Sequence, residues 1–421
     1  MTEQTNTPIL RFKGFNDEWS LSTIGALGDF YYGKSAPKWS ITKDVGIPCI
    51  RYGELYTKFN NVVNEIYSYT SMPKEKLRFS KGGEILIPRV GEDPLDFAKC
   101  VYLPQKDIAI GEMISVYNTK ENPLFLTYYF NTKMKYEFAK RVEGASVSNL
   151  YYSYLEDIKL KIPDIREQQK LGVFFSKLDR QIELEEEKLE LLEQQKRGYM
   201  QKIFTQELKF KNSQLENIKW SYKTLEELNS FFTDGNYGES YPKSEDMSDK
   251  NDGVAFLRGS NLKKGRITLE DANYISKKKH SELTTGHLFL DDIVIAVRGS
   301  LGAVGYVNEN MVGNNINSQL AIIRTSSSLL YGKYLLYYLM SNQGKKELLS
   351  RVTGTALKQL PIKQIKQIKV PVPKLYEQHK IANFLSELDN LIDNKHKMYK
   401  RCLDHYVIYT PQVYRFDLMY H

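Results

Sequence analysis

In two long segments of the chain, apolar residues recur at alternating steps of four and three. The first series consists of Leu171, Phe175, Leu178, Ile182, Leu189, Leu192, Tyr199 and Ile203. The second consists of Ile381, Leu385, Leu388, Ile392, Tyr399, Cys402, Tyr406 and Tyr409. Such a seven-residue repeat is typical of a coiled-coil seam. We therefore predict long helices over residues 164–208 and 374–410, whose apolar stripes each need a partner.

Charged residues interrupt both series. Glu185 and Lys395 occupy the same seam position in the two segments, with opposite charges, and Lys196 is a further break. Polar seam residues lower stability and can specify register. We hypothesise an ion pair, or a pair of half-buried charges, near the centre of a two-helix rod; the alternative is that both side chains extend into solvent. The two helices pair either within one chain, which is the simplest arrangement, or with copies in a homodimer.

The chain also contains an internal duplication. Residues 141–183 and 351–393 align without a gap at a constant offset of 210 residues. The identical pairs are Arg141/Arg351, Gly144/Gly354, Leu150/Leu360, Pro163/Pro373, Glu167/Glu377, Gln168/Gln378, Lys170/Lys380, Leu178/Leu388 and Asp179/Asp389. Weaker matches precede this block, such as YGKSAP at 32–37 with YGESYP at 237–242. A repeat of this length indicates a duplicated fold unit, and hence a pseudo-twofold molecule that meets its target at two places.

Short apolar runs bounded by Gly, Asn and Pro predict strands ahead of each long helix. They cover residues 84–88, 113–117, 292–297 and 319–324, with helical patches at 124–141 and 329–352. Each copy therefore reads as an α+β domain followed by a helix, and we place the domains at 8–163 and 217–373.

The amino-acid composition excludes only a few classes of function. The formal net charge of +8 is compatible with a polyanionic partner. Three widely separated cysteines indicate no disulfide or zinc framework. No apolar run is long enough for a membrane span, and the first residues lack a signal pattern, so a cytoplasmic protein is the simplest interpretation.

The sequence shows no catalytic motif. GDFYYGKS at 28–35 matches a phosphate-loop pattern, but Pro37 and Trp39 make a poor helix start, and Glu239 of the second copy replaces Lys34. The six histidines have no metal-ligand spacing. We therefore expect a chain without catalytic residues, metal or bound cofactor.

Polar and basic loops lie at the ends of the predicted strands in both copies. Arg, Asn, Gln and Ser side chains read base edges, and Lys, Ser and glycine-rich backbone bind phosphates. The copies also differ here, with Ser148 and Asn149 in one where Lys358 and Gln359 stand in the other. This pattern suggests two readers of two DNA sequences. The candidate DNA-binding residues are Arg51, Arg89, Ser148, Asn149, Arg258, Asn261, Arg298, Ser300, Asn317 and Lys358.

The chain resembles the specificity subunit of type I restriction-modification systems over essentially its whole length. The resemblance is most specific at IKLKIPDIREQQKLGVFFSKLDRQI (158–182) and IKVPVPKLYEQHKIANFLSELDNLI (368–392), with LRFKGFNDEW (10–19) and VRGSLGAVG (297–305) as further family segments. It implies an α+β fold with two tandem target-recognition domains and two long antiparallel coiled-coil helices.

The same resemblance implies the function and the partners. Each domain reads one half of a bipartite double-stranded DNA target, while the helices set the spacing and dock two methyltransferase subunits, which restriction subunits join. S-adenosylmethionine, ATP and Mg are then expected on those partner subunits. Structural junctions are expected at Pro163, Glu167, Gln168, Pro373, Glu377 and Gln378. The alternative function is a non-enzymatic coiled-coil adaptor with two protein-binding α+β domains.

The second helix departs from the family pattern near its end. The stretch after residue 396 is rich in tyrosine and lacks the usual basic, Gln-containing end. We expect Pro411 to stop this helix, because proline cannot donate the backbone hydrogen bond that continues it.

Overall fold

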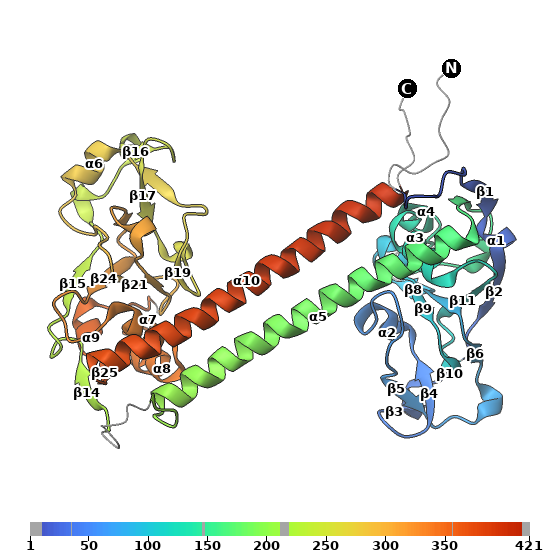
Figure 1. Ribbon diagram of the computed structural model, residues 1–421, viewed down its shortest axis with the longest axis horizontal. Coiled ribbons are helices and arrows are strands. Elements are labelled where there is room, and N and C mark those ends of the chain that lie inside the picture. The colour runs from blue at the N-terminus through green and yellow to red at the C-terminus, as the bar shows by residue number, and fades with distance from the viewer. Residues whose placement is uncertain (1–10, 35, 145–147, 211–218, 356, 415–421) are drawn as a thin grey trace. The chain divides into compact units, whose positions relative to one another are not determined.

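The computed structural model describes residues 11–34, 36–144, 148–210, 219–355 and 357–414, and for 406–414 only the backbone. The predicted domain starts, residues 8 and 217, and the side chains of Tyr406 and Tyr409 lie outside the described parts. The chain divides into two compact units: residues 1–186 with 397–421, and residues 187–396. Figure 1 shows strands and short helices in each of them.

The first unit contains a four-stranded sheet of order β2-β11-β7-β9, a five-stranded sheet of order β3-β5-β4-β10-β6, and two-stranded pairs β1-β13 and β12-β8. The strands are β1 Ser20–Thr23, β2 Gly28–Tyr32, β3 Ile41–Thr42, β4 Ile47–Ile50, β5 Ser68–Thr70, β6 Phe79–Lys81, β7 Glu84–Pro88, β8 Val90–Gly91, β9 Val101–Leu103, β10 Lys106–Ile110, β11 Ile114–Thr119, β12 Ser148–Asn149 and β13 Lys159–Ile162. The helices are α1 Ile24–Leu27, α2 Tyr52–Thr57, α3 Pro123–Thr132 and α4 Lys135–Ala139, with 3-10 turns η1 Lys38–Ser40, η2 Lys74–Lys76, η3 Pro94–Ala98 and η4 Tyr152–Tyr154.

The second unit repeats this plan. Its sheets have the orders β15-β24-β21-β22-β19-β18 and β16-β20-β17-β23, with the pair β14-β25. The strands are β14 Ser221–Thr224, β15 Phe231–Asp234, β16 Met247–Ser248, β17 Val254–Leu257, β18 Leu262–Lys263, β19 Gly265–Ile267, β20 Asn273–Ile275, β21 Ile293–Ala296, β22 Val304–Tyr306, β23 Asn315–Ile316, β24 Leu320–Arg324 and β25 Lys369–Val372. The helices are α6 Lys277–Glu282, α7 Gly332–Met340, α8 Asn342–Ser350 and α9 Ile362–Lys366, with 3-10 turns η5 Gly238–Ser240, η6 Ser244–Asp246, η7 Gly259–Asn261 and η8 Glu309–Met311.

The central strand of each unit is buried on both faces. In β7, Ile85 and Ile87 pack into the core shared with α3, whereas Leu86 packs on the opposite side. In β21, Ile293 packs toward α7, and Val294 packs toward the second sheet. Side chains alternate between the faces of a strand, so burial on both faces requires an unbroken apolar run. This is why these runs were recognisable in the sequence, and all four predicted strands are confirmed as β7, β11, β21 and β24.

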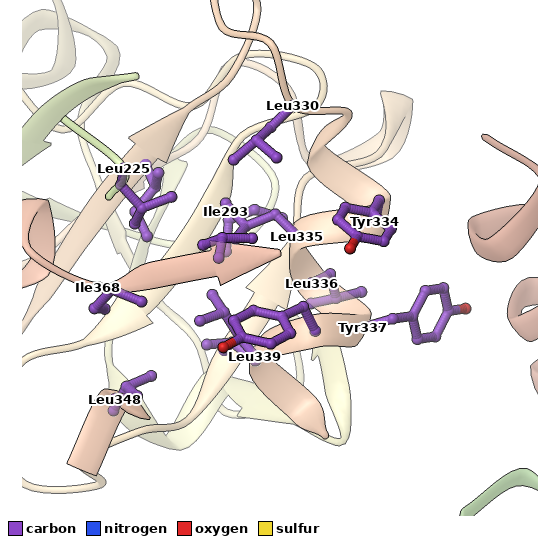
Figure 2. Close-up of a cluster of buried hydrophobic side chains, with 14 of the residues drawn as sticks. Leu225, Ile293, Leu330, Tyr334, Leu335, Leu336, Tyr337, Leu339, Leu348 and Ile368 are labelled. Carbon is purple, nitrogen blue, oxygen red and sulfur yellow. The ribbon is translucent and has the colours of Figure 1, made fainter. Parts of the chain in front are cut away.

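Figure 2 shows the core between α7 and the sheet of the second unit. Tyr334, Leu335 and Leu339 of α7 are completely buried, and with Ile293 and Ile368 they belong to one apolar cluster. The predicted helical patch 329–352 is in fact two helices, because the Ser341 hydroxyl caps the start of α8 by accepting a hydrogen bond from the Gly344 amide at 3.1 Å. The patch 124–141 is likewise divided into α3 and α4.

The long helices are α5, Ile165–Phe204, and α10, Leu375–Tyr414, each 40 residues long. The expectation that Pro411 stops the second helix is wrong, since α10 continues to Tyr414. Pro411 has no amide to donate to the carbonyl four residues before it, so the last turn of α10 lacks one backbone hydrogen bond. The predicted helix spans, 164–208 and 374–410, differ from the observed ones only at their ends.

Within the second unit, the two helices run antiparallel beside each other. The Lys196 ammonium lies 2.5 Å from the Asp389 carboxylate, the rings of Tyr199 and Phe384 are 5.2 Å apart, and His396 lies 3.6 Å from Glu193. Residue numbers fall along α10 as they rise along α5, which confirms antiparallel pairing within one chain. In the first unit, Leu403 of α10 lines the same cavity as Ile182 of α5.

The apolar stripes also have a second role that the heptad pattern did not reveal. Leu171 and Phe175 belong to the core of the first unit, and Ile381 and Leu385 to the core of the second. The first turns of each helix are therefore part of a globular domain. Glu185 is buried, with 6% of its surface exposed, and Lys395 is half-buried. Since they belong to different units, their proposed pairing stays a prediction. Among the described residues, no helix is long and apolar enough to cross a membrane.

Candidate nucleic-acid interface

In the first unit, a cation–aromatic cluster forms where β7 ends. The guanidinium carbon of Arg89 lies 4.7 Å from the centroid of the Tyr32 ring and 5.5 Å from that of Tyr151. Such contacts hold an arginine in one orientation while leaving guanidinium donors available. Burial raises the pKa of Tyr32, so its hydroxyl is neutral at physiological pH.

Backbone hydrogen bonds fasten Glu143, Asn149 and Leu150 to the same place. Glu143 and Asn149 exchange backbone hydrogen bonds of 2.9 and 2.7 Å, and the Leu150 amide donates to the Arg89 carbonyl at 2.9 Å. Gly144 has a φ of 121°, a conformation that favours glycine. Three of the predicted residues, Arg89, Ser148 and Asn149, are therefore brought together, although the Ser148 side chain is buried.

The second unit has the same construction. The Arg298 guanidinium carbon lies 5.6 Å from the centroid of the Tyr237 ring. Thr353 and Gln359 exchange backbone hydrogen bonds of 2.9 Å, and the Leu360 amide donates to the Val297 carbonyl at 3.0 Å. Tyr237, Arg298, Gln359 and Ile362 are among the residues that line a depression of about 290 Å³. The predicted residue Lys358 is exposed in this loop.

The two Tyr–Arg pairs lie at the same end of the sheet in the two units, but their residues are not at equivalent positions in the strand register. Pro88 pairs with Ile114 across the sheet, and Ala296 pairs with Leu320, so Arg89 matches Val297 and Arg298 is one residue further on. Tyr32 pairs with Ser115, as Asp234 pairs with Ala321, so Tyr237 is three residues beyond the structural match of Tyr32. The alignment of 32–37 with 237–242 is therefore wrong in the folded protein. Because neither the arginines nor the tyrosines are at equivalent positions, duplication of a single Tyr–Arg pair does not explain why both units contain one.

Arg51 directly precedes α2, and Arg258 directly precedes the 3-10 turn η7. The Arg51 amide donates to Glu54 Oε2 at 2.7 Å, and the Arg258 amide donates to Asn261 Oδ1 at 3.0 Å. The Arg258 guanidinium also donates to the Asp271 carbonyl at 2.9 Å.

Asn261 does not present its side chain to DNA. It is completely buried, and its amide group donates to the carbonyls of Thr268 at 3.1 Å and Glu270 at 3.2 Å. Buried polar groups with all partners inside the protein hold the local backbone, so we correct its predicted role to that of a structural residue. Asn317 is also buried, and its Oδ1 accepts from the Gln319 amide at 3.0 Å. Ser300 is exposed, in the turn after Arg298.

Sequence reasoning missed the aromatic part of each cluster. Tyr32 and Tyr237 were not among the candidate residues, although both stand in Tyr-Gly turns that had been noticed as a repeat. The signal was the shared dipeptide next to a strand end. It does not identify the ring as part of a binding cluster, because no local pattern shows which distant arginine the ring will meet.

The junction residues form matching hydrogen-bond networks. Gln168 donates to the carbonyl of Pro163 at 2.9 Å and accepts from the Asn122 amide, just before α3, at 3.0 Å. Gln378 donates to the carbonyl of Pro373 at 3.0 Å and accepts from the Tyr331 amide, just before α7, at 2.8 Å. Each glutamine therefore ties the start of a long helix to the start of a domain helix.

The glutamates of the junctions have different partners. Glu167 is completely buried and accepts from the Arg11 guanidinium at 2.9 and 2.5 Å. Glu377 accepts from the indole N–H of Trp220 at 3.2 Å, and burial raises the pKa of its carboxyl.

Comparison with known proteins decides the family. The model of the type I restriction modification DNA specificity domain matches residues 16–194 and again residues 217–401, one match for each copy of the repeat. The chain belongs to this family.

Similar proteins within the family carry names of the same kind. The MjaVIII specificity subunit of Methanocaldococcus jannaschii is 26% identical over 311 residues, which are 70% of this chain and 71% of that protein. The EcoBI specificity subunit of Escherichia coli is 24% identical, over 62% of this chain and 57% of that protein. Both are named type I restriction enzyme specificity subunits.

The fold matches that of solved members. The S subunit of a type I restriction-modification system from M. genitalium superposes with a TM-score of 0.63 over 98% of this chain and 100% of that one, at 17% identity. A chain from a study of complex assembly in a type I system gives a TM-score of 0.51 at 15% identity, over 96% and 99% of the two chains. The family's two-domain α+β architecture is therefore that of this chain.

Proposed function

We propose that this specificity subunit reads a bipartite double-stranded DNA target, with one half-site for each α+β domain. The main supporting observation is that both units have a Tyr–Arg cluster at the same end of the sheet, next to a pair of residues that exchange backbone hydrogen bonds, Glu143–Asn149 or Thr353–Gln359. The side chains around the two clusters differ. A shared backbone scaffold that carries different side chains in the two units is suited to the recognition of two different DNA sequences.

The chemistry of each cluster suits base edges. Arginine can donate two hydrogen bonds to guanine, and asparagine or glutamine can pair with adenine in the major groove. The first unit offers Arg89 and Asn149, and the second offers Arg298, Gln359 and Lys358. Lysines and backbone amides around them would bind phosphates, which makes the affinity sensitive to salt.

The long helices are proposed to set the spacing between half-sites and to dock methyltransferase subunits. At 1.5 Å per residue, a helix of 40 residues is about 60 Å long. Such a rod can hold two readers about one helical turn of DNA apart, so that the intervening base pairs are counted but not read. The seam residues would maintain the register of the rod, and the Pro-Glu-Gln junctions would fix how each helix leaves its domain.

Catalysis is assigned to the partners. Methyl transfer from S-adenosylmethionine and cleavage driven by ATP and Mg would belong to methyltransferase and restriction subunits that assemble on this chain. The specificity subunit itself would contribute DNA recognition and geometry.

Methylome sequencing of cells that express this chain with its methyltransferase partner tests the proposal directly. We expect one split recognition sequence with a spacer of fixed length. Arg298→Ala should relax one half-site only, by about 1–3 kcal/mol if the contact is a bidentate guanine pair. Equal weakening on all sequences would make Arg298 a phosphate contact, and an unsplit or absent motif would contradict the proposed function.

A further inference from the structure

The two units differ in charge at one matching segment. Gly33 and Gly235 occupy corresponding places, since their amides donate to Ile114 and Leu320, the corresponding first residues of β11 and β24. From there to the starts of β4 and β17, residues 33–46 contain three lysines and one acidic residue, Asp44, whereas residues 235–253 contain two lysines and five acidic residues. Lys34, Lys38 and Lys43 are all exposed. A polyanion would therefore be attracted to this segment in the first unit and repelled in the second.

Trp39 stands within the basic segment and is 79% exposed. The other two tryptophans, Trp19 and Trp220, are 2% and 9% exposed. The backbone beside Trp39 is firmly held, because Ser40 is completely buried, its amide donates to Pro37 at 2.8 Å, and its hydroxyl lies 2.9 Å from that of Thr70. A large aromatic surface held in water on an anchored turn is available to pack against a ligand.

More basic side chains adjoin this turn. Lys74, Lys76 and Arg78 are exposed, and the Lys34 ammonium donates to the Glu75 carbonyl at 3.4 Å. Arg78 donates to the carbonyl of Tyr32 at 2.7 Å, and Tyr32 is the ring against which Arg89 packs. Arg78 therefore connects this group of basic residues to the proposed reading cluster of the first unit.

We propose that Trp39 and the basic residues around it form a second DNA contact in the first unit, which binds duplex beside the half-site without sequence preference. The lysines would neutralise phosphates, and the indole would pack on sugars and base edges in the minor groove. Protein interfaces are depleted of lysine at their centres, so the lysines around Trp39 favour a polyanion over a protein surface. The inference rests on the proposed function only in taking duplex DNA as the ligand.

The test uses the full-length chain, a duplex of random sequence and iodide quenching of tryptophan fluorescence. Because the other two tryptophans are buried, the quenching reports Trp39. We expect duplex to protect Trp39, and Trp39→Ala to weaken binding to random duplex about ten-fold, as truncation of a central interface tryptophan does. Trp39→Phe should restore most of the affinity. Lys38→Gln should lower the slope of log K against log salt by about 1.

Tyr241→Ala is the matched control, because Tyr241 lies in the acidic counterpart segment and is 38% exposed. It should leave binding to random duplex within about two-fold of wild type, well short of the loss expected for a stacking contact. Equal thermal midpoints of wild type and Trp39→Ala would show that the variant folds normally.

The proposal is wrong if duplex leaves the quenching of Trp39 unchanged, or if Trp39→Ala binds random duplex as tightly as wild type. It is also wrong if Trp39 is protected by the methyltransferase subunit or by anionic lipid vesicles instead of DNA. Failure of the proposed function has a different signature: site selection with the assembled complex would yield no split consensus, while random duplex still protected Trp39. If both hold, Trp39→Ala keeps the wild-type consensus and lowers affinity for every sequence.

Discussion

The two units have carboxylates at the same positions of the repeat, but at each position one unit provides a cationic partner and the other a neutral one. At the start of the long helix, Glu167 is bound by the Arg11 guanidinium, whereas Glu377 accepts from the neutral indole of Trp220. Twelve residues later, the cationic partner is in the second unit and the neutral partner is in the first. Asp389 lies 2.5 Å from the Lys196 ammonium, whereas Asp179 accepts from the amide of Asn61 at 2.8 Å.

What stays constant at the second position is a tyrosine. The hydroxyl of Tyr128 donates to Asp179 at 2.6 Å, and that of Tyr337 donates to Asp389 at 2.7 Å. The duplication therefore preserved a hydrogen-bond donor for each of the four carboxylates, and the same tyrosine donor for the two aspartates, but not the charge next to them. The fold tolerates the change of charge because a buried carboxylate needs hydrogen-bond donors above all, and these can be either neutral or charged.

The largest difference between the units is expected at the helix starts. Glu167→Gln should destabilise the first unit by about 3 kcal/mol, because it leaves Arg11 almost buried without its bidentate partner. Glu377→Gln should change the stability of the second unit by less than about 1 kcal/mol, since glutamine can still accept from the indole. Hydrogen exchange resolved by unit measures both. Equal effects in the two units would show that the partner's charge does not matter.

The glutamines beside these glutamates should behave alike. Gln168→Ala and Gln378→Ala each remove the side-chain partner of a backbone amide and of a proline carbonyl, which should cost about 2 kcal/mol in the corresponding unit. Urea unfolding monitored in each unit provides the measurement. A loss in one unit alone would mean that the junctions are not equivalent in spite of their matching hydrogen bonds.

A smaller contrast is expected at the aspartates. Asp389→Asn should lower stability by about 1 kcal/mol, because Lys196 and Asp389 are mostly but not completely buried and solvent weakens the pair. Asp179→Asn should be neutral or slightly stabilising, because burial raises the pKa of Asp179 and the uncharged side chain avoids that penalty. Thermal unfolding of both variants tests this; a greater loss in Asp179→Asn would reverse the interpretation.

The smallest effect is a dependence on pH. Burial raises the folded-state pKa of both Asp179 and Glu377. Their ionisation therefore opposes folding, and the penalty grows as pH rises from the unfolded-state values of about 3.9 and 4.3 toward the folded-state values. The double variant Asp179→Asn, Glu377→Gln should lose less stability than wild type over this interval. Parallel curves for unfolding free energy against pH would contradict the pKa shifts.

Local patterns in the sequence predicted much of the framework. The seven-residue spacing showed two helices, the apolar runs showed β7 and β21, and the gapless repeat marked Gln168 and Gln378 as junction residues. These features depend on periodicity over a few residues, which sequence displays directly. The sequence does not show that α10 continues past Pro411 to Tyr414, because proline lacks the amide donor that normally continues a helix.

The candidate recognition surface was only half predictable. Arg89 and Arg298 were recognised from the loops that contain them, but their tyrosine partners come from segments more than fifty residues away and from shifted positions in the two units. Asn261 was chosen for its residue type, and only the packed loop around it shows that its amide is used internally.

By itself, the sequence determined the duplication, the two long helices, the principal strands and the family. The tertiary structure alone decided which tyrosine each arginine meets, which carboxylate receives a cation, and that Trp39 stands exposed while the other two tryptophans are buried. The physical reason is that helices and strands follow from local spacing, whereas charge partners and exposure depend on contacts between residues far apart in the chain, which only the packed fold brings together.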